Sequence, residues 1–252
     1  MIEKKHIDFL NQFGYVVIKN WSNLKEIKKL KYELQDATDK NLKQKKTFDR
    51  GMIHNCFMHG PSLLNHIGSK KLRVATDKFL CKNSIIYAYQ SSSLAPYSKN
   101  YGSRIHVDCP RFIPNYRTNL GYIMPLDDFT DENGATLVLP GSHKLEKIPH
   151  LKFFHKNCLE IICKAGDAIF FDGRLVHSAG ENKTSIWRYA LTINFCRPYM
   201  RSRFDFPRLI KNKKIKLNPS SRTFLGFNVR VPVNLKQFYL PKSKRLYLPN
   251  QE

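Results

Sequence analysis

Apolar residues in the first third of the chain follow helical and strand patterns in turn. Residues 3–13 predict a short helix, and the β-branched and aromatic run 15–18 predicts a strand. Apolar positions then recur at helical spacing over residues 24–42, with Ser22 as the expected N-cap. Residues 41–63 have no clear period, so we expect a loop region there, followed by a further helix at 70–79.

Short apolar segments separated by turn residues dominate the chain after residue 80. They predict strands at 84–89, 104–108, 120–126, 135–139, 159–163, 168–171 and 189–195. Several short strands at this spacing indicate a mainly β sandwich or barrel with flanking helices. We expect one domain over residues 1–252: helical and strand elements at 1–80, a β core at about 84–197, and a basic cover at 198–252.

Composition narrows the class of protein. The chain has 252 residues, 42% of them hydrophobic, which indicates a globular fold. No window has the ~18 apolar residues that a membrane span needs, and the N-terminus has no apolar leader, so we expect a cytoplasmic protein. The formal net charge is +23, and residues 197–252 alone carry 14 Lys or Arg against 2 Asp or Glu.

Such a positive field attracts anions. It favours a phosphorylated or carboxylated small-molecule substrate, while nucleic acid is a less favoured partner that charge alone does not exclude. The excess also fits a Lys-rich chain with solvated surface charge. The sequence does not indicate an oligomeric state.

The residues that suggest chemistry are His106 and Asp108. On a strand they project from the same face, so an imidazole and a carboxylate can reach one metal ion. His177, at the end of a later apolar run, is the candidate third ligand. Two histidines and one carboxylate form the facial triad of non-haem Fe(II) oxygenases. A single His-x-Asp tripeptide also arises by chance or as ordinary surface residues.

Two further features strengthen the metal interpretation. The run NGATLVLPGSH occupies residues 133–143, between Asp108 and His177, and Arg188 follows His177 by eleven residues. With these features the sequence resembles the phytanoyl-CoA dioxygenase family of Fe(II)/2-oxoglutarate oxygenases over residues 15–196. The resemblance implies a double-stranded β-helix core, a jelly-roll of the cupin type, with flanking helices.

The resemblance also implies roles for individual residues. His106, Asp108 and His177 would be catalytic residues that hold Fe(II), and Arg188 would bind the distal carboxylate of 2-oxoglutarate. Arginine suits that role because its planar fork matches a carboxylate. Gln90, on the preceding strand, is a candidate to hydrogen-bond cosubstrate or substrate. Candidate contacts to an anionic substrate are Arg104, which we expect on the His106 face of the strand, and Arg111, Arg197 and Arg201 at the rim.

These expectations describe a hydroxylase that consumes O2 and 2-oxoglutarate and releases succinate and CO2. Asp108 points to oxygenation rather than halogenation, because halogenases of this superfamily have a small residue in place of the acidic ligand. Two alternatives remain open. The same iron centre supports desaturation, epimerisation or demethylation, and a basic jelly-roll can also bind nucleic acid or another polyanion without chemistry.

Overall fold

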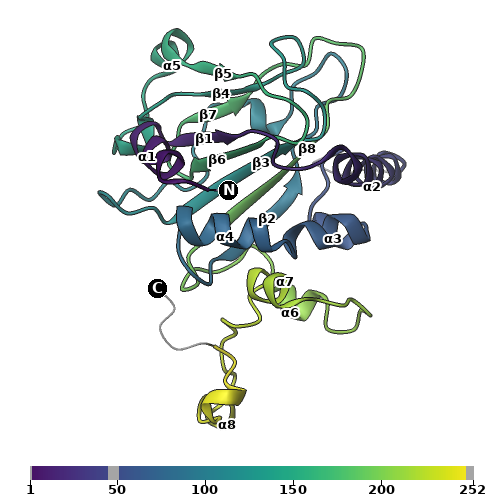
Figure 1. Ribbon diagram of the computed structural model, residues 1–252, viewed down its shortest axis with the longest axis vertical. Coiled ribbons are helices and arrows are strands. Elements are labelled where there is room, and N and C mark those ends of the chain that lie inside the picture. Colours follow the sequence, from purple (N-terminus) through teal and green to yellow (C-terminus); the bar gives the residue numbers. More distant parts are fainter. Residues whose placement is uncertain (1, 45–50, 248–252) are drawn as a thin grey trace.

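Two antiparallel β-sheets lie at the centre of the protein in a computed structural model that describes residues 2–44 and 51–247 (Figure 1). The larger sheet has the order β1-β6-β3-β8-β2 and the smaller sheet the order β5-β4-β7. The strands are β1 (Tyr15–Ile18), β2 (Ile85–Ser91), β3 (Asn119–Pro125), β4 (Thr136–Val138), β5 (Leu159–Ile161), β6 (Ala168–Asp172), β7 (His177–Ala179) and β8 (Ala190–Cys196). The predicted jelly-roll core with flanking helices is confirmed.

Helices cover the outer face of the larger sheet. They are α1 (Lys4–Phe13), α2 (Leu24–Leu42), α3 (Pro61–Ile67) and α4 (Lys70–Phe79). Leu30 and Leu34 of α2 and Leu72 of α4 are fully buried in one apolar cluster with Phe170 and Phe195 of the sheet. Burying one such side chain contributes about 1.5–3 kcal/mol, so this helix–sheet layer is the main source of stability. None of the described helices is long and apolar enough to cross a membrane.

Strand β8 separates this layer from the inside of the jelly-roll. Leu191, Ile193 and Phe195 face the helices and are fully buried, whereas Thr192 and Asn194 face the other way and are partly exposed. Side chains alternate across a strand, so these two residues lie on the inner face. Solvent therefore reaches the interior of the jelly-roll beside β8.

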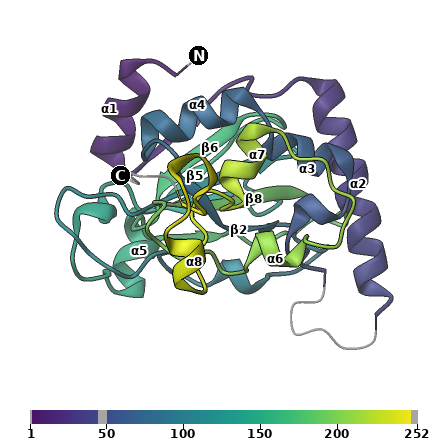
Figure 2. The same ribbon diagram turned by 90° about the horizontal axis from the view of Figure 1, so that it is seen from below.

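The C-terminal segment extends from the side of the molecule opposite the smaller sheet (Figure 1). It contains α6 (Phe206–Leu209), α7 (Pro219–Phe224) and α8 (Leu235–Phe238). Phe224 of α7 is fully buried, with its ring centroid 5.0 Å from that of Phe195 on β8. Seen from below, the segment passes in front of β2 and β8 (Figure 2). An aromatic contact near the middle of the basic segment thus fixes it to the core.

The structure corrects three local predictions. Residues 104–108 do not form a strand: only His106 is paired, in a single bridge to His177. The expected loop at 41–63 contains a 3-10 turn at Cys56–Met58 and the start of α3, while residues 45–50 lie outside the described residues. The N-cap of α2 is Asn23 rather than Ser22, because the Asn23 side chain accepts a hydrogen bond from the Glu26 N–H at 2.9 Å.

The reason for α3 lies outside its own sequence. The two carboxylate oxygens of Glu33, on α2, accept hydrogen bonds from the N–H groups of Ser62 and Leu63, each at 2.9 Å. Those N–H groups belong to the first turn, where a helix has no internal acceptor. A cap supplied from 29 residues away stabilises a helix too short to show a period.

Candidate active site

Three side chains with metal-binding atoms meet inside the jelly-roll. Nε2 of His106 lies 3.6 Å, and Nε2 of His177 3.9 Å, from Oδ1 of Asp108. All three ligand atoms lie within 4.8 Å of one another. With bonds of about 2.1 Å, neighbouring octahedral ligands lie ~3 Å apart, so a shift of under ~1 Å brings these atoms around one ion. Two nitrogens and one oxygen on a single side form a donor set suited to Fe(II) with open positions.

Both imidazoles have their other nitrogen occupied. Nδ1 of His106 is 2.6 Å from the carbonyl oxygen of Arg104, and Nδ1 of His177 is 2.9 Å from that of Leu175. A carbonyl oxygen only accepts, so each Nδ1 carries the proton and donates it. Each Nε2 is then left with a free lone pair, which is the state that a metal ligand requires.

Main-chain pairing places the two histidines side by side. His106 and His177 exchange two backbone hydrogen bonds, each of 3.0 Å, and their ring centroids are 4.3 Å apart. On its other side His177 pairs with Val138 of β4, within the sequence run 133–143. Ser142, from the end of that run, accepts a hydrogen bond from the Val176 N–H at 2.9 Å. The run therefore supports the strand that presents His177.

Asp108 is held by two amide side chains. Nδ2 of Asn194 donates to Oδ2 of Asp108 at 3.1 Å, and Nδ2 of Asn119 donates to Oδ1 of Asn194 at 2.8 Å. Burial disfavours the Asp108 carboxylate, but the neighbouring imidazoles of His106 and His177 and the Asn194 amide together lower the pKa of this carboxyl. Asp108 is therefore ionised at neutral pH.

The two histidines differ in how readily they protonate. Burial lowers the pKa of His177 and outweighs the attraction of Asp108. At His106 burial acts in the same direction, but the Asp108 carboxylate, which a protonated Nε2 would face, and the hydrogen bond to the Arg104 carbonyl raise the pKa above its usual value. His106 is thus the first of the two imidazoles to be protonated as the pH falls.

The ring of Phe171 packs against the ring of His177. The centroid of the Phe171 ring is 4.7 Å from that of His177. Phe171 pairs across the sheet with Gly121, where a Cβ atom would lie 2.1 Å from the Phe171 ring. Only glycine leaves space for the ring at this point. The absence of a side chain at Gly121 on β3 therefore allows Phe171 to pack against His177.

Arg188 is an almost fully buried cation, with 2% of its surface exposed. Its guanidinium donates to the carbonyl oxygens of Ser92 at 2.9 Å and Gly134 at 3.2 Å, and it lies 4.4 Å from the Phe129 ring centroid. No described carboxylate bonds to it, since Asp127 attracts it only from a distance. Burial lowers the pKa of Arg188 to about 9. A buried charge of this kind is suited to receive an anionic group.

Arg188 lies in the same interior as the triad. It contacts Phe129, and Phe129 belongs to one apolar cluster with Phe171, whose ring packs against His177. Gln90 of β2 also belongs to this interior. It lies opposite Thr192 in the β2–β8 register and therefore shares the inner face of β8. Oε1 of Gln90 accepts a hydrogen bond from Nη1 of Arg203 at 3.0 Å.

Of the four arginines expected to contact an anionic substrate, Arg104, Arg111 and Arg201 are exposed, and Arg197 is half-buried. Arg104 is exposed and lies over the Tyr101 ring at 3.9 Å, so it does not point into a pocket from a strand. Arg197 lies over Tyr116 at 4.0 Å, and its Nε donates to the Arg117 carbonyl.

Sequence reasoning missed Asn194, Asn119, Gly121 and Arg203. The alternation in the segment that forms β8 was a usable signal for Asn194, because a polar residue there faces away from the helix layer. Nothing in the sequence indicated that Arg203 reaches Gln90 from the C-terminal segment.

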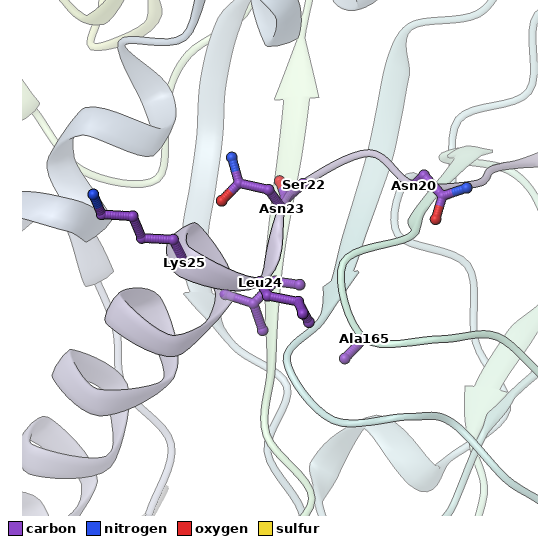
Figure 3. Close-up of a pocket in the computed structure, with 7 residues that line it drawn as sticks. Asn20, Ser22, Asn23, Leu24, Lys25 and Ala165 are labelled. Atoms are coloured by element: carbon purple, nitrogen blue, oxygen red, sulfur yellow. The ribbon is translucent and has the colours of Figure 1, made fainter.

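Two hollows lie away from the triad. One is lined by residues at the start of α2 and by Ala165, and contains a single charged side chain, Lys25 (Figure 3). The other lies within the C-terminal segment and against Ile85; its charged lining residues are Arg201, Asp205, Arg208, Lys211, Lys213, Arg222 and Arg230. Neither hollow contains the three ligand residues.

Comparison with known proteins places this geometry in a family. The family model "Phytanoyl-CoA dioxygenase (PhyH)" matches residues 10–190, which is more than half of the chain. The chain belongs to the phytanoyl-CoA dioxygenase family. The match contains His106, Asp108, His177 and Arg188 and ends before most of β8 and the C-terminal segment.

Relatives and solved structures agree with this assignment. The uncharacterized protein Rv1501 of Mycobacterium tuberculosis is 26% identical over 97% of this chain and 94% of its own length. The dioxygenase sphC of Aspergillus fumigatus is 30% identical over 45% of this chain and 31% of its own. AviO1 from Streptomyces viridochromogenes Tue57 shares the fold with a TM-score of 0.68 and 20% identity, over 79% of this chain and 97% of its own.

Two further structures of the same fold have descriptions that name α-ketoglutarate. The carbocyclase SnoK from nogalamycin biosynthesis has a TM-score of 0.64 and 16% identity over 77% of this chain and 84% of its own. The epimerase SnoN, in complex with Fe3+, alpha ketoglutarate and nogalamycin RO, has the same TM-score and identity over 77% and 82%. The phytanoyl-CoA dioxygenase family member described here is thus a 2-oxoglutarate-dependent non-haem iron dioxygenase.

Proposed function

We propose that His106, Asp108 and His177 hold the Fe(II) ion of this dioxygenase, and that the enzyme hydroxylates an unactivated C–H bond of a small anionic metabolite. The single observation that carries the metal assignment is the meeting of two Nε2 atoms and one carboxylate oxygen, with both Nδ1 atoms already bonded to carbonyls. These donors fit iron in number and type. An ion held by these three residues would keep open positions for 2-oxoglutarate and O2.

Arg188 is the proposed partner of the distal carboxylate of 2-oxoglutarate. Its charge is buried and bonded only to carbonyl oxygens, which are weaker partners than a carboxylate. A diacid that extends from the triad would neutralise this charge. Gln90, on the same inner face as Thr192, is positioned to donate an amide N–H to the cosubstrate or to the substrate.

When bound, iron and 2-oxoglutarate supply an oxidant for C–H bonds, with succinate and CO2 as products. The chain contributes binding and orientation. Asp108 provides one negative charge. The hydrogen bonds at Nδ1 fix the orientation of both imidazoles. Phe171 excludes water from the side of His177 that its ring covers. A substrate C–H bond would be oriented beside the triad, within the interior that the inner faces of β2 and β8 border.

The anionic character of the substrate is supported best by Arg203. Its guanidinium is bonded to Gln90, which lies on the inner face, and none of the described carboxylates pairs with it. Two residues along a strand span ~6.6 Å, so Gln90 lies about that far along the sheet from Ala88, the partner of Asn194. A phosphate or carboxylate at Arg203 would thus leave a neutral part of the substrate near the triad.

The test is anaerobic binding followed by turnover. Purified protein should bind Fe(II) and then 2-oxoglutarate, and should release succinate when O2 is admitted. His106→Ala and Asp108→Ala should lose both binding and release. Full 2-oxoglutarate-dependent activity in either variant would disprove the ligand assignment.

A reaction other than hydroxylation at the same iron centre is supported by two structures of the same fold, which are named a carbocyclase and an epimerase. Product mass separates the reactions: hydroxylation adds one oxygen, desaturation removes two hydrogens, and epimerisation leaves the mass unchanged. The basic C-terminal segment supports a second candidate function, polyanion binding. Salt-sensitive binding of RNA or DNA, with no substrate-stimulated succinate release, would favour it.

A further inference from the structure

The two oxygens of Asp108 have different surroundings. Oδ1 faces the Nε2 atoms of His106 and His177, at 3.6 and 3.9 Å. Oδ2 points away from them and accepts a hydrogen bond from Asn194 at 3.1 Å. One oxygen is therefore directed to the metal position, while the other is engaged by the protein.

The Asn194 amide can act in only one orientation. Its Oδ1 accepts a hydrogen bond from Nδ2 of Asn119 at 2.8 Å, so its own N–H groups must face Asp108. Asn119 itself is 4% exposed, and its Oδ1 is buried without a hydrogen-bond partner. A buried acceptor without a partner is costly. This unfavourable contribution to stability therefore lies at Asn119, the residue that orients Asn194.

The register of the larger sheet fixes this arrangement. Asn119 lies opposite Cys196, and Asn194 lies opposite Gly121, so the two amides sit diagonally on the inner face of β3 and β8. Gly121 has no side chain, and the Phe171 ring fills the space above it on the inner face, across from Asn194. Neither amide belongs to the metal-binding triad, and both come from rigid strands.

We propose that Asn194, oriented by Asn119, is a positioning residue that keeps Asp108 a one-oxygen ligand. This inference rests on the proposed function, in which the triad holds iron. A carboxylate that bound through both oxygens would occupy a fourth octahedral position and leave two for 2-oxoglutarate and O2, which together need three. By engaging Oδ2, Asn194 preserves the third open position.

The deciding variant is Asn194→Leu, which keeps the number and branching of the side-chain heavy atoms and removes the N–H donor. Thr192→Val, on the same strand and face, is the matched control, because Thr192 makes no described contact with Asp108. Anaerobic titration with Co(II) alone measures metal affinity, and titration of the Co(II)-loaded protein with 2-oxoglutarate measures the remaining open positions. The visible spectrum of bound Co(II) reports the coordination number.

We expect Asn194→Leu to weaken Co(II) binding by about 10- to 100-fold, the usual cost of losing a partner of a metal ligand. In the metal-saturated variant, 2-oxoglutarate should also bind more weakly than in wild type, with a changed Co(II) spectrum. Thr192→Val should change the metal affinity by no more than about twofold. Wild-type metal and 2-oxoglutarate affinities in Asn194→Leu would overturn the inference.

Circular dichroism and the melting temperature separate misfolding from loss of positioning. If Asn194→Leu does not fold, Asn119→Ala takes its place, because it leaves Asn194 present but free to turn. That variant should weaken 2-oxoglutarate binding in the same direction, and unchanged affinities would again overturn the inference. Absence of Co(II) binding in wild type would instead refute the proposed metal site itself, so the two failures are distinguishable.

Discussion

The two faces of strand β8 have opposite character. Toward the helices, Leu191, Ile193 and Phe195 are completely buried. Toward the inside of the jelly-roll, Thr192 and Asn194 are polar and partly exposed. One strand therefore contributes stability from one face and a reactive interior from the other.

The difference shows how the fold separates stability from chemistry. The outer face buries apolar area against α2, α3 and α4, which contributes stability whichever ligand is present. The inner face keeps polar groups, a buried cation and the triad in an interior that solvent reaches. Substitutions on the two faces should thus have different signatures: loss of folding on one, and loss of binding with folding intact on the other.

The largest functional effect is expected from Asp108→Ala. Removing one of three ligands, and the charge that balances the ion, should reduce Fe(II) affinity beyond the ~10- to 100-fold caused by an outer partner. The melting temperature of the metal-free protein should stay near that of wild type, because the Asp108 side chain is 24% exposed and not part of the apolar core. Metal titration and thermal unfolding test both parts. A metal-free variant that unfolds would contradict the separation of the two faces.

The opposite signature is expected from Phe195→Ala on the outer face. Removing this fully buried ring, which packs against Phe224, should lower the free energy of unfolding by about 3–5 kcal/mol. The fraction that remains folded should bind Fe(II) with wild-type affinity. Denaturant unfolding and metal titration below the transition provide the two values. A loss of metal affinity in the folded fraction would show that the faces are coupled.

Arg188→Lys should impair 2-oxoglutarate more than metal. Lysine keeps the charge but lacks the planar fork, so the loss is expected to be about 1.5–3 kcal/mol in 2-oxoglutarate binding. The Fe(II) affinity of the variant should stay unchanged. Titration of the metal-loaded protein with 2-oxoglutarate, followed by its charge-transfer absorption, measures the effect. Equal affinities in wild type and variant would remove Arg188 from the site.

Metal affinity should fall with pH in a defined direction. Ligating imidazoles must be neutral, and the pKa of His106 is raised above its usual value of ~6.5. Affinity is therefore expected to be complete above that raised pKa and to decline as the pH falls through it, whereas His177, with its lowered pKa, protonates later. Co(II) titrations from pH 8 to 5.5 show where the decline begins. A decline that starts only below the usual imidazole pKa would assign it to His177, whose pKa is lowered.

The smallest effect is expected from Arg203→Ala. An exposed charge that is bonded to one amide contributes about 1 kcal/mol to binding an anion, or a fivefold rise in substrate KM. Arg208→Ala, in the C-terminal hollow, is the control and should leave KM unchanged. Substrate-stimulated succinate release in a screen of phosphorylated and carboxylated metabolites supplies the assay. Equal changes in both variants would assign the effect to general charge.

Much of this architecture could be predicted from the amino-acid sequence. Short apolar and β-branched runs between turn residues located the strands of the larger sheet to within about two residues. The order of His106, Asp108, His177 and Arg188, together with the run 133–143, indicated the family. These signals are local: they depend on residue type, on spacing and on the run 133–143. The family and the jelly-roll fold therefore followed from the sequence.

Features that depend on contacts between residues far apart in the sequence could not be predicted from it. Helix α3 depends on a cap from Glu33, and the segment before Asp108 pairs only at His106 because His177 is the one partner it reaches. Likewise, the place of Asn194 depends on the β3–β8 register and that of Arg203 on the path of the C-terminal segment. Such partners lie tens of residues away, and their positions exist only in the folded protein.

The most direct test of the central claim is anaerobic titration of wild-type, His106→Ala and His177→Ala protein with Fe(II) and then 2-oxoglutarate. The account predicts one Fe(II) per wild-type chain, a visible charge-transfer band when 2-oxoglutarate is added, and loss of both in each variant. Stoichiometric iron and the same band in either histidine variant would contradict it.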